Sequence, residues 1–394
     1  MVVTGPRQAG KTTLVRRCLA GAGTFVRLDD EATLQAARAD PAAVAAFGPT
    51  PRAIDEVQRA GDGLVRAIKR LVDDDRTPGQ FLLNGSADFL TVPTISESLA
   101  GRATLLQLWP FTQGEMAGEP DGMLEVAFDD HRRLLGGDAS PYETRDYFER
   151  LCAGGFPEPT TLPGRDRGRW FRSYVQTVTE RDVTELTGAR RAGELPRLLR
   201  LLAASTASEL VVARIHDQSQ LGRDATRDYV SYLEMTYLIV RIPAWSRNLT
   251  RKIARHPKVH VSDSGLAAHL LGKNADALAR PTDPARGALL ETFAVNELLR
   301  QATWLDRDVT IHHLRDRDGA EVDVVAEASD GAVVAIEVKT STAVSPADAK
   351  WLAWLRDKIR DDFVCGLVLY AGDRPFSLGD RLLALPLSYL WTAG

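Results

Sequence analysis

The chain has 394 residues and a formal net charge of −4, and 44% of its residues are hydrophobic. This length predicts two or three domains, each with a core of its own. Because the charge is nearly balanced, the overall electrostatics of the protein does not indicate any class of partner. The sequence contains no signal peptide and no apolar run of membrane-spanning length, and its three cysteines lie far apart without metal spacing. We therefore expect a soluble, cytoplasmic protein with reduced, buried thiols and no membrane partner.

The most specific motif lies at the start of the chain. The run Gly5-Pro6-Arg7-Gln8-Ala9-Gly10-Lys11-Thr12-Thr13 fits the pattern G-x-x-x-x-G-K-[ST], and it lies between a short apolar pair and a helical stretch, 13–20. In such a loop the backbone amides and the positive end of the following helix point at the phosphates of a nucleotide. We expect Lys11 to reach the β and γ phosphates of ATP and the Thr12 hydroxyl to hold Mg²⁺. The strand before the loop is either short or continues upstream of the given sequence.

Two further strand ends are expected to complete this nucleotide site. An apolar pair is followed by Asp55 and Glu56, and the strand 81–83 is followed by Asn84. Asp55 is placed to hold Mg²⁺ through water, Glu56 to polarise the attacking water, and Asn84 to sense the γ phosphate. Each signal alone also fits a solvated strand end, but the three together are much more specific.

Strands and helices alternate through this part of the chain. Strands at 24–28, near Asp55 and at 81–83 alternate with helices at 31–47 and 62–73. This order predicts a parallel sheet with helices on both faces and its ligand at the carboxyl ends of the strands. Arg102 comes just before a further strand, 103–108, and is placed to reach a γ phosphate in its own chain or in a neighbour's. A solvated arginine at a helix end explains Arg102 equally well.

The middle of the chain becomes helical after a glycine- and acid-rich boundary at 114–137. Residues 211–219, the turn 220–222 and residues 224–235 have the pattern of a helix-turn-helix. The second helix of this pattern carries residues on its early turns where a recognition helix presents them to the major groove. These residues are Arg223, Thr226, Arg227 and Tyr229.

The segment from Met235 to Ser262 contains no acidic residue and supplies six positive charges. Such a segment can form the hairpin wing of a winged helix and lie along a phosphate backbone. The expected DNA contacts of the helix-turn-helix and the wing are Arg223, Arg227, Arg247, Arg251 and Lys252. Charge runs are usually solvated faces, and winged helices also serve as protein-docking modules, so a protein partner is the alternative.

The last third of the chain carries a second group of charged residues. The predicted helix 288–301 contains Glu291, and the strands 321–325 and 333–339 form a hairpin. Alternation along the second strand places Glu337 and Lys339 on one face, and Asp323 lies on the neighbouring strand. Three carboxylates and one lysine suit Mg²⁺ or Mn²⁺ and the activation of a water for attack on a phosphodiester.

Cross-strand salt bridges also occur on exposed strands without any function. Ile336 and Val338 flank the charged pair, however, and charged groups inside an apolar strand are costly unless they serve a site. The flanking residues therefore favour a site.

The motifs of the first third resemble those of AAA-type P-loop ATPases that carry a C-terminal DUF4143 region. Besides the loop, the resemblance is carried by Ile54-Asp55-Glu56, Leu83-Asn84-Gly85-Ser86, Leu99-Ala100-Gly101-Arg102, Trp109-Pro110-Phe111, Glu180-Arg181-Asp182, Lys258 to Leu271 and Gly287 to Leu298. The C-terminal part is similar to the PD-(D/E)xK nuclease fold, whose motif Glu291, Asp323, Glu337 and Lys339 match. The resemblance implies ATP binding and leaves the cellular role open. Asn84 stands where relatives often have threonine.

The sequence thus predicts an α/β protein with three domains. These are a P-loop (AAA-type) parallel-sheet domain at 1–137, a helical and winged-helix domain at 138–280, and an α/β restriction-endonuclease-like domain at 281–394. We expect a Mg²⁺-dependent ATPase that couples its nucleotide state to a DNA-binding winged helix and a nuclease-like domain with a second Mg²⁺ or Mn²⁺. The alternative is a regulatory ATPase that acts on a protein partner and has a catalytically silent nuclease-like domain. If Arg102 acts on the nucleotide of a neighbouring subunit, the protein must form a homo-oligomer.

Overall fold

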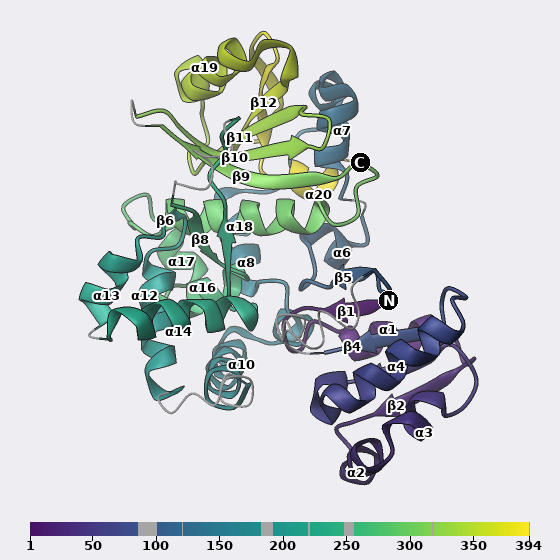
Figure 1. The fold of residues 1–394 in the computed structure, drawn as a ribbon. Coiled ribbons are helices and arrows are strands. Elements are labelled where there is room, and N and C mark those ends of the chain that lie inside the picture. The colour runs from purple at the N-terminus through teal and green to yellow at the C-terminus, as the bar shows by residue number, and fades with distance from the viewer. Residues whose placement is uncertain are drawn as a thin grey trace. The chain divides into compact units, whose positions relative to one another are not determined.

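A computed structural model describes residues 1–85, 101–119, 121–182, 192–219, 221–247, 256–316 and 319–393. These residues form two compact units (Figure 1). The first unit contains Met1–Pro110, and the second contains most of the chain from Phe111 onward. The three-domain boundaries at 137/138 and 280/281 stay predictions.

The first unit is built on a parallel sheet. Its strands are β1 (Val2–Thr4), β2 (Thr24–Arg27), β3 (Arg52–Asp55), β4 (Phe81–Asn84) and β5 (Leu105–Gln107), in the order β2-β3-β4-β1-β5. Every neighbouring pair is parallel. The carboxyl ends of β1, β3 and β4 therefore meet at one edge of the sheet, as the alternation of strands and helices predicted.

Helices cover both faces of this sheet. On one face Val2 and Ile54 pack with Leu64 and Ile68 of α4 (Asp62–Asp74). On the other face Val3 packs with residues of α1 (Lys11–Leu19). Successive side chains of a strand point to opposite faces, and this alternation assigns Val2 and Val3 to different helices.

The expected single helix over 31–47 was wrong. The structure has two helices here, α2 (Glu31–Ala39) and α3 (Pro41–Ala46). Pro41 has no backbone N–H to continue α2, but it fits the first position of a new helix. The Asp40 carboxylate accepts a hydrogen bond from the Ala43 N–H at 3.0 Å and so caps α3.

The second unit begins with helices that precede a small antiparallel sheet. The helices are α6 (Gln113–Ala117), α7 (Met123–Asp130), α8 (Thr144–Ala153), α9 (Pro157–Thr161), α10 (Gly164–Thr177) and α12 (Leu195–Ala204). They are followed by β6 (Ser208–Glu209), α13 (Val212–Ser219), α14 (Arg223–Met235), β7 (Ile239–Ile242) and β8 (Lys258–Val261). The sheet order is β6-β8-β7, so β8 is central.

The rest of the second unit is a mixed sheet with helices. After α16 (Ser264–Leu270), α17 (Ala275–Leu278) and α18 (Arg286–Gln301) come β9 (Val309–Arg315), β10 (Glu321–Ala328), β11 (Val333–Lys339), α19 (Lys350–Ile359), β12 (Phe363–Tyr370), β13 (Phe376–Gly379), β14 (Leu382–Pro386) and α20 (Tyr389–Thr392). The sheet order is β13-β14-β12-β11-β10-β9, and β10 and β11 form the predicted antiparallel hairpin.

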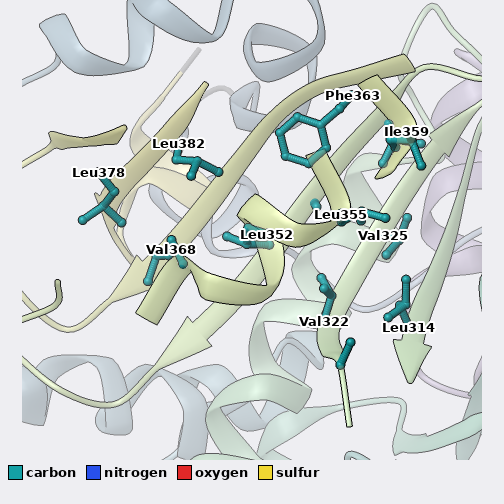
Figure 2. Close-up of a cluster of buried hydrophobic side chains, with 14 of the residues drawn as sticks. Leu314, Val322, Val325, Leu352, Leu355, Ile359, Phe363, Val368, Leu378 and Leu382 are labelled. Carbon is teal, nitrogen blue, oxygen red and sulfur yellow. The ribbon is translucent and has the colours of Figure 1, made fainter. Parts of the chain in front are cut away.

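Helix α19 supplies part of the core of this sheet. Figure 2 shows Leu352 and Leu355 of α19 among Val322, Val325 and Val368 of the strands. Strands β10 to β12 are buried along most of their length, which indicates that both faces of the sheet are covered. This packing fixes the positions of the charged residues that β10 and β11 carry.

No helix in the described part of the chain is long and apolar enough to cross a membrane. The cysteines Cys18, Cys152 and Cys365 are free. Cys365 is buried and Cys152 is partly buried, but Cys18 on α1 is exposed. The expectation of buried thiols was therefore wrong for Cys18.

Candidate functional site

The loop between β1 and α1 depends on backbone angles that favour glycine. Gly5 has φ of +139° and Gly10 has φ of +98°, and Gln8 between them also has positive φ. A Cβ atom on Gly5 would lie 2.0 Å from the carbonyl oxygen of Leu108, which follows β5. The loop can therefore lie against β5 only because residue 5 has no side chain.

The lysine of the loop is buried inside it. Lys11 is 5% exposed, and its Nζ donates to the carbonyl oxygens of Gly5 at 2.8 Å and Pro6 at 2.7 Å. Burial of an ammonium group is costly unless its donors are satisfied, and both of these acceptors are neutral carbonyl oxygens. Phosphate oxygens form stronger, charge-assisted hydrogen bonds with such a group.

A hydroxyl and a carboxylate meet beside this lysine. The Thr12 hydroxyl donates to the Asp55 carboxylate at 3.1 Å, and Asp55 is 5% exposed. Burial raises the pKa of Asp55, and the hydrogen bond from Thr12 lowers it in part. A bound cation would stabilise the charged carboxylate further, and both oxygens suit Mg²⁺. These residues fit the metal that an ATP site requires.

Two more predicted residues lie at the same edge of the sheet. The Glu56 N–H donates to the side-chain oxygen of Asn84 at 3.4 Å, and Asn84 is buried at the end of β4. Glu56 has φ of +57°, an unusual angle for a glutamate that residues in functional sites often adopt. The structure thus brings Thr12, Asp55, Glu56 and Asn84 together.

Arg102 lies at the opposite edge of the sheet. It precedes β5, in which Leu105 pairs with Val2 in parallel, and it borders a cavity of about 200 Å³ at the start of β1 and β4. Its guanidinium forms an ion pair with Asp73 near the end of α4, with Nε 2.7 Å from a carboxylate oxygen. The expectation that Arg102 reaches a γ phosphate in its own chain was therefore wrong, because the loop lies at the carboxyl ends of the strands. Contact with a neighbouring chain's nucleotide stays a prediction.

The C-terminal carboxylates surround a lysine that the prediction did not include. Lys258 at the start of β8 is 1% exposed. Its Nζ lies 2.8 Å from Glu291 on α18, 3.2 Å from Glu321 and 3.5 Å from Asp323, the last two on β10. No local sequence signal identifies this group, because Lys258 is one of the six cations of the predicted wing.

The predicted pair on β11 is present beside this group. Lys339 Nζ lies 2.7 Å from Glu337 Oε1, and the backbone N–H of Val338 donates to Asp323 at 2.9 Å. Burial and the nearby Asp323 raise the pKa of Glu337 to about 7, and Lys339 opposes this shift. Burial likewise raises the pKa of Glu291 to about 8, against the effect of Lys258.

A divalent metal does not fit this arrangement. Ammonium groups already lie within hydrogen-bonding distance of Glu291 and Glu337, and Asp323 accepts a backbone hydrogen bond. Among the described residues no three or more His, Cys, Asp or Glu side chains are arranged to hold a metal ion. The expected second Mg²⁺ or Mn²⁺ thus has no site built for it here.

The helix α14 presents a charge-balanced surface. Arg223 and Arg227 are exposed, and Arg227 lies 3.7 Å from Asp224. Thr226 and Tyr229 are buried in the unit, so their expected presentation to a major groove was wrong.

The wing residues are described only in part. Arg247 forms an ion pair with Asp362. The predicted DNA contacts Arg251 and Lys252 lie outside the described residues.

The parallel sheet and the loop with Lys11, Thr12 and Asp55 define a P-loop nucleotide-binding unit. Comparison with protein families gives the same assignment: residues 1–117 match an AAA domain, residues 144–277 match a domain of unknown function (DUF8612), and residues 286–390 match a domain of unknown function (DUF4143). The chain thus carries an AAA domain at its N-terminus and a DUF4143 region at its C-terminus. Its AAA domain supports ATP binding.

Two known proteins are similar to this chain over its whole length, and a solved structure aligns with part of it. Uncharacterized proteins of Mycobacterium bovis and Mycobacterium tuberculosis are each 29% identical to it over 398 aligned positions, which span 100% of this chain and 81% of theirs. A solved structure of the Thermotoga maritima RuvB Holliday junction branch migration motor aligns with 61% of this chain and 81% of its own, at 16% identity. The TM-score of this alignment is 0.28.

Proposed function

We propose that the first unit binds ATP with Mg²⁺ and hydrolyses its γ phosphate. The observation that carries this proposal is the contact of the Thr12 hydroxyl with the Asp55 carboxylate beside the buried ammonium of Lys11. The Thr12 hydroxyl and the Asp55 carboxylate can hold one cation, while the Lys11 ammonium neutralises phosphate oxygens.

Each residue at this edge of the sheet has a role in the proposed reaction. Lys11 exchanges its two carbonyl acceptors for oxygens of the β and γ phosphates, and the backbone N–H groups of the loop from Arg7 to Thr13 donate to the remaining oxygens. Bound Mg²⁺ would supply charge neutralisation across the β and γ oxygens. The Glu56 carboxylate orients the attacking water, and the Asn84 side chain hydrogen-bonds the γ phosphate or that water.

Nucleotide binding by the Lys11→Ala variant tests this assignment. Because charge-assisted hydrogen bonds are lost, ATP affinity should fall roughly 100-fold, as read by titration with a fluorescent ATP analogue. Arg66→Ala on the exposed side of α4 is the matched control and should bind as the unmodified chain does. Equal affinity in the Lys11→Ala variant would refute the loop assignment.

The nucleotide state is proposed to act on the helices and strands from α12 to β8. Their order is helix, strand, helix, helix, strand, strand, with β8 between β6 and β7, and we propose that they form a winged-helix module. The exposed turns of α14 alternate arginine with aspartate, and Arg241 on β7 forms an ion pair with Glu234. A surface with matched charges favours a protein partner over a phosphate backbone.

Nucleic-acid binding is the second candidate, supported by the acid-free segment between Met235 and Ser262. ATP turnover measured with and without duplex, single-stranded and branched DNA separates the two. Turnover indifferent to all three supports the protein-directed switch. Stimulation by one of them, removed by raised salt, supports DNA instead.

A further inference from the structure

The cluster of C-terminal carboxylates surrounds a cation that the chain itself supplies, the Lys258 ammonium. Lys258 comes from β8, whereas Glu291 comes from α18 and Glu321 and Asp323 come from β10. The ammonium nitrogen lies between 2.8 and 3.5 Å from an oxygen of each carboxylate. An ammonium group has three N–H donors, and three carboxylates are within its reach.

We propose that the Lys258 ammonium takes the place that a divalent metal occupies in a nuclease-like carboxylate group. The unit therefore binds no metal there and cleaves no phosphodiester. The same lysine instead joins the β6-β8-β7 sheet to α18 and to the mixed sheet.

Charge and geometry both exclude a metal beside this lysine. Mg²⁺ and Mn²⁺ require several oxygen ligands at short distance in near-octahedral order. The Lys258 ammonium lies 2.8 Å from Glu291 Oε1 and so occupies the position that a metal bound to this oxygen would need. A metal ion next to it would place two cations close together in a buried site, where they repel strongly. The neighbouring Glu337 is paired with Lys339 through Oε1 at 2.7 Å, and its buried Oε2 has no hydrogen-bond partner in the described part of the chain. This single oxygen cannot supply the several ligands that Mg²⁺ or Mn²⁺ require.

A second set of contacts supports the joining role. His260, two residues after Lys258 on β8, lies with Nδ1 3.1 Å from the hydroxyl of Thr292 on α18. That hydroxyl is 2.8 Å from the hydroxyl of Thr206, which precedes β6. All three side chains are buried, as is Lys258. Strand β8 is thus bound to α18 through two neighbouring polar contacts.

Mn²⁺ binding by the nucleotide-free full-length chain provides the first test. An Asp55→Asn background removes the carboxylate proposed to hold the cation at the ATP site, and bound Mn²⁺ is read from its paramagnetic resonance signal. We expect no bound Mn²⁺ at micromolar metal and no metal-dependent nicking of DNA. Two results would each overturn the proposal, whatever the ATP site does. The first is the binding of one equivalent of Mn²⁺ that Asp323→Asn abolishes. The second is a nicking activity that Asp323→Asn abolishes.

Thermal unfolding provides the second test. Lys258→Met leaves buried carboxylates without their cation, and the Tm of the second unit should fall by about 10 °C. The control is Lys273→Met, which removes a partly exposed ion pair with Asp283 and should shift the Tm by about 2 °C or less. An unchanged Tm in Lys258→Met would overturn the joining role. Failure of that variant to fold agrees with the proposal, and the Mn²⁺ measurement on the chain with Lys258 intact still decides its metal part.

Discussion

Replacement of Gly5 by alanine tests how the phosphate loop is held against β5. The added Cβ would lie 2.0 Å from the Leu108 carbonyl oxygen, and φ at this position is +139°. Gly10 offers a matched control in the same loop, because its φ is +98° but its Cβ would meet nothing within 4 Å. Gly5→Ala thus combines backbone strain with a steric clash, whereas Gly10→Ala introduces strain alone.

The two effects have separable magnitudes. A non-glycine residue at such angles costs about 1–3 kcal/mol, so Gly10→Ala should lower the free energy of unfolding by about 2 kcal/mol. Displacement of a packed peptide group adds about 2 kcal/mol, by analogy with overpacked cores, so Gly5→Ala should cost about 4 kcal/mol. For a unit of this size the difference corresponds to roughly 8 °C in Tm.

The assay is thermal unfolding without nucleotide, with amide hydrogen exchange of β1 and β5 to assign the transition to the first unit. Gly5→Ala should unfold well below Gly10→Ala, and its exchange in β5 should be faster. Equal Tm values for the two variants would show that Leu108 moves away freely. The inference that the loop can lie against β5 only with glycine at position 5 would then be refuted.

Three other predictions concern catalysis and charge. Glu56→Gln should bind ATP within a few-fold of the unmodified affinity but hydrolyse it about 100-fold more slowly; unchanged turnover would contradict its role with the attacking water. Arg102→Ala should lower turnover only at protein concentrations where chains associate, and a specific activity independent of concentration in the unmodified chain would count against action between subunits. Burial, opposed by Arg300, raises the pKa of Glu297 from 4.5 to about 7, so the folded chain retains a proton that the unfolded chain releases. The free energy of unfolding should therefore fall as pH rises from about 4.5 to 7, and Tm measured against pH should lose this part of its slope in Glu297→Gln; parallel curves would refute it.

The nucleotide edge was predictable because its signals are local. A loop motif, an acid after an apolar strand and a polar residue after another each depend on a few adjacent residues. The parallel sheet then brings Thr12, Asp55 and Asn84 together without further information. The close approach of Leu108 to Gly5 was not predictable, because it depends on where β5 adds to the sheet.

The helix-turn-helix and the alanine-rich helix show what periodicity leaves undetermined. Asp40 followed by Pro41 is a local signal for the start of a new helix. The helix-favouring composition on both sides of Pro41 nevertheless led to the prediction of one continuous helix. Thr226 and Tyr229 lie on a helix as expected, but which side of α14 faces the core depends on packing against the rest of the unit. Helical pattern alone does not reveal this.

The acid-free segment from Met235 to Ser262 limits what charge counting can establish. The three of its cations that lie in the described residues have counter-ions outside the segment: Arg241 pairs with Glu234, Arg247 with Asp362, and Lys258 with Glu291. A local excess of positive charge therefore does not imply a free basic surface, because ion pairs are made in space and not along the sequence. Lys258 shows the consequence most clearly, since a residue that composition assigns to a phosphate backbone is buried as the cation of the carboxylates that the nuclease motif requires. The same argument predicts that Lys258 and not Lys339 decides whether that motif can take a metal.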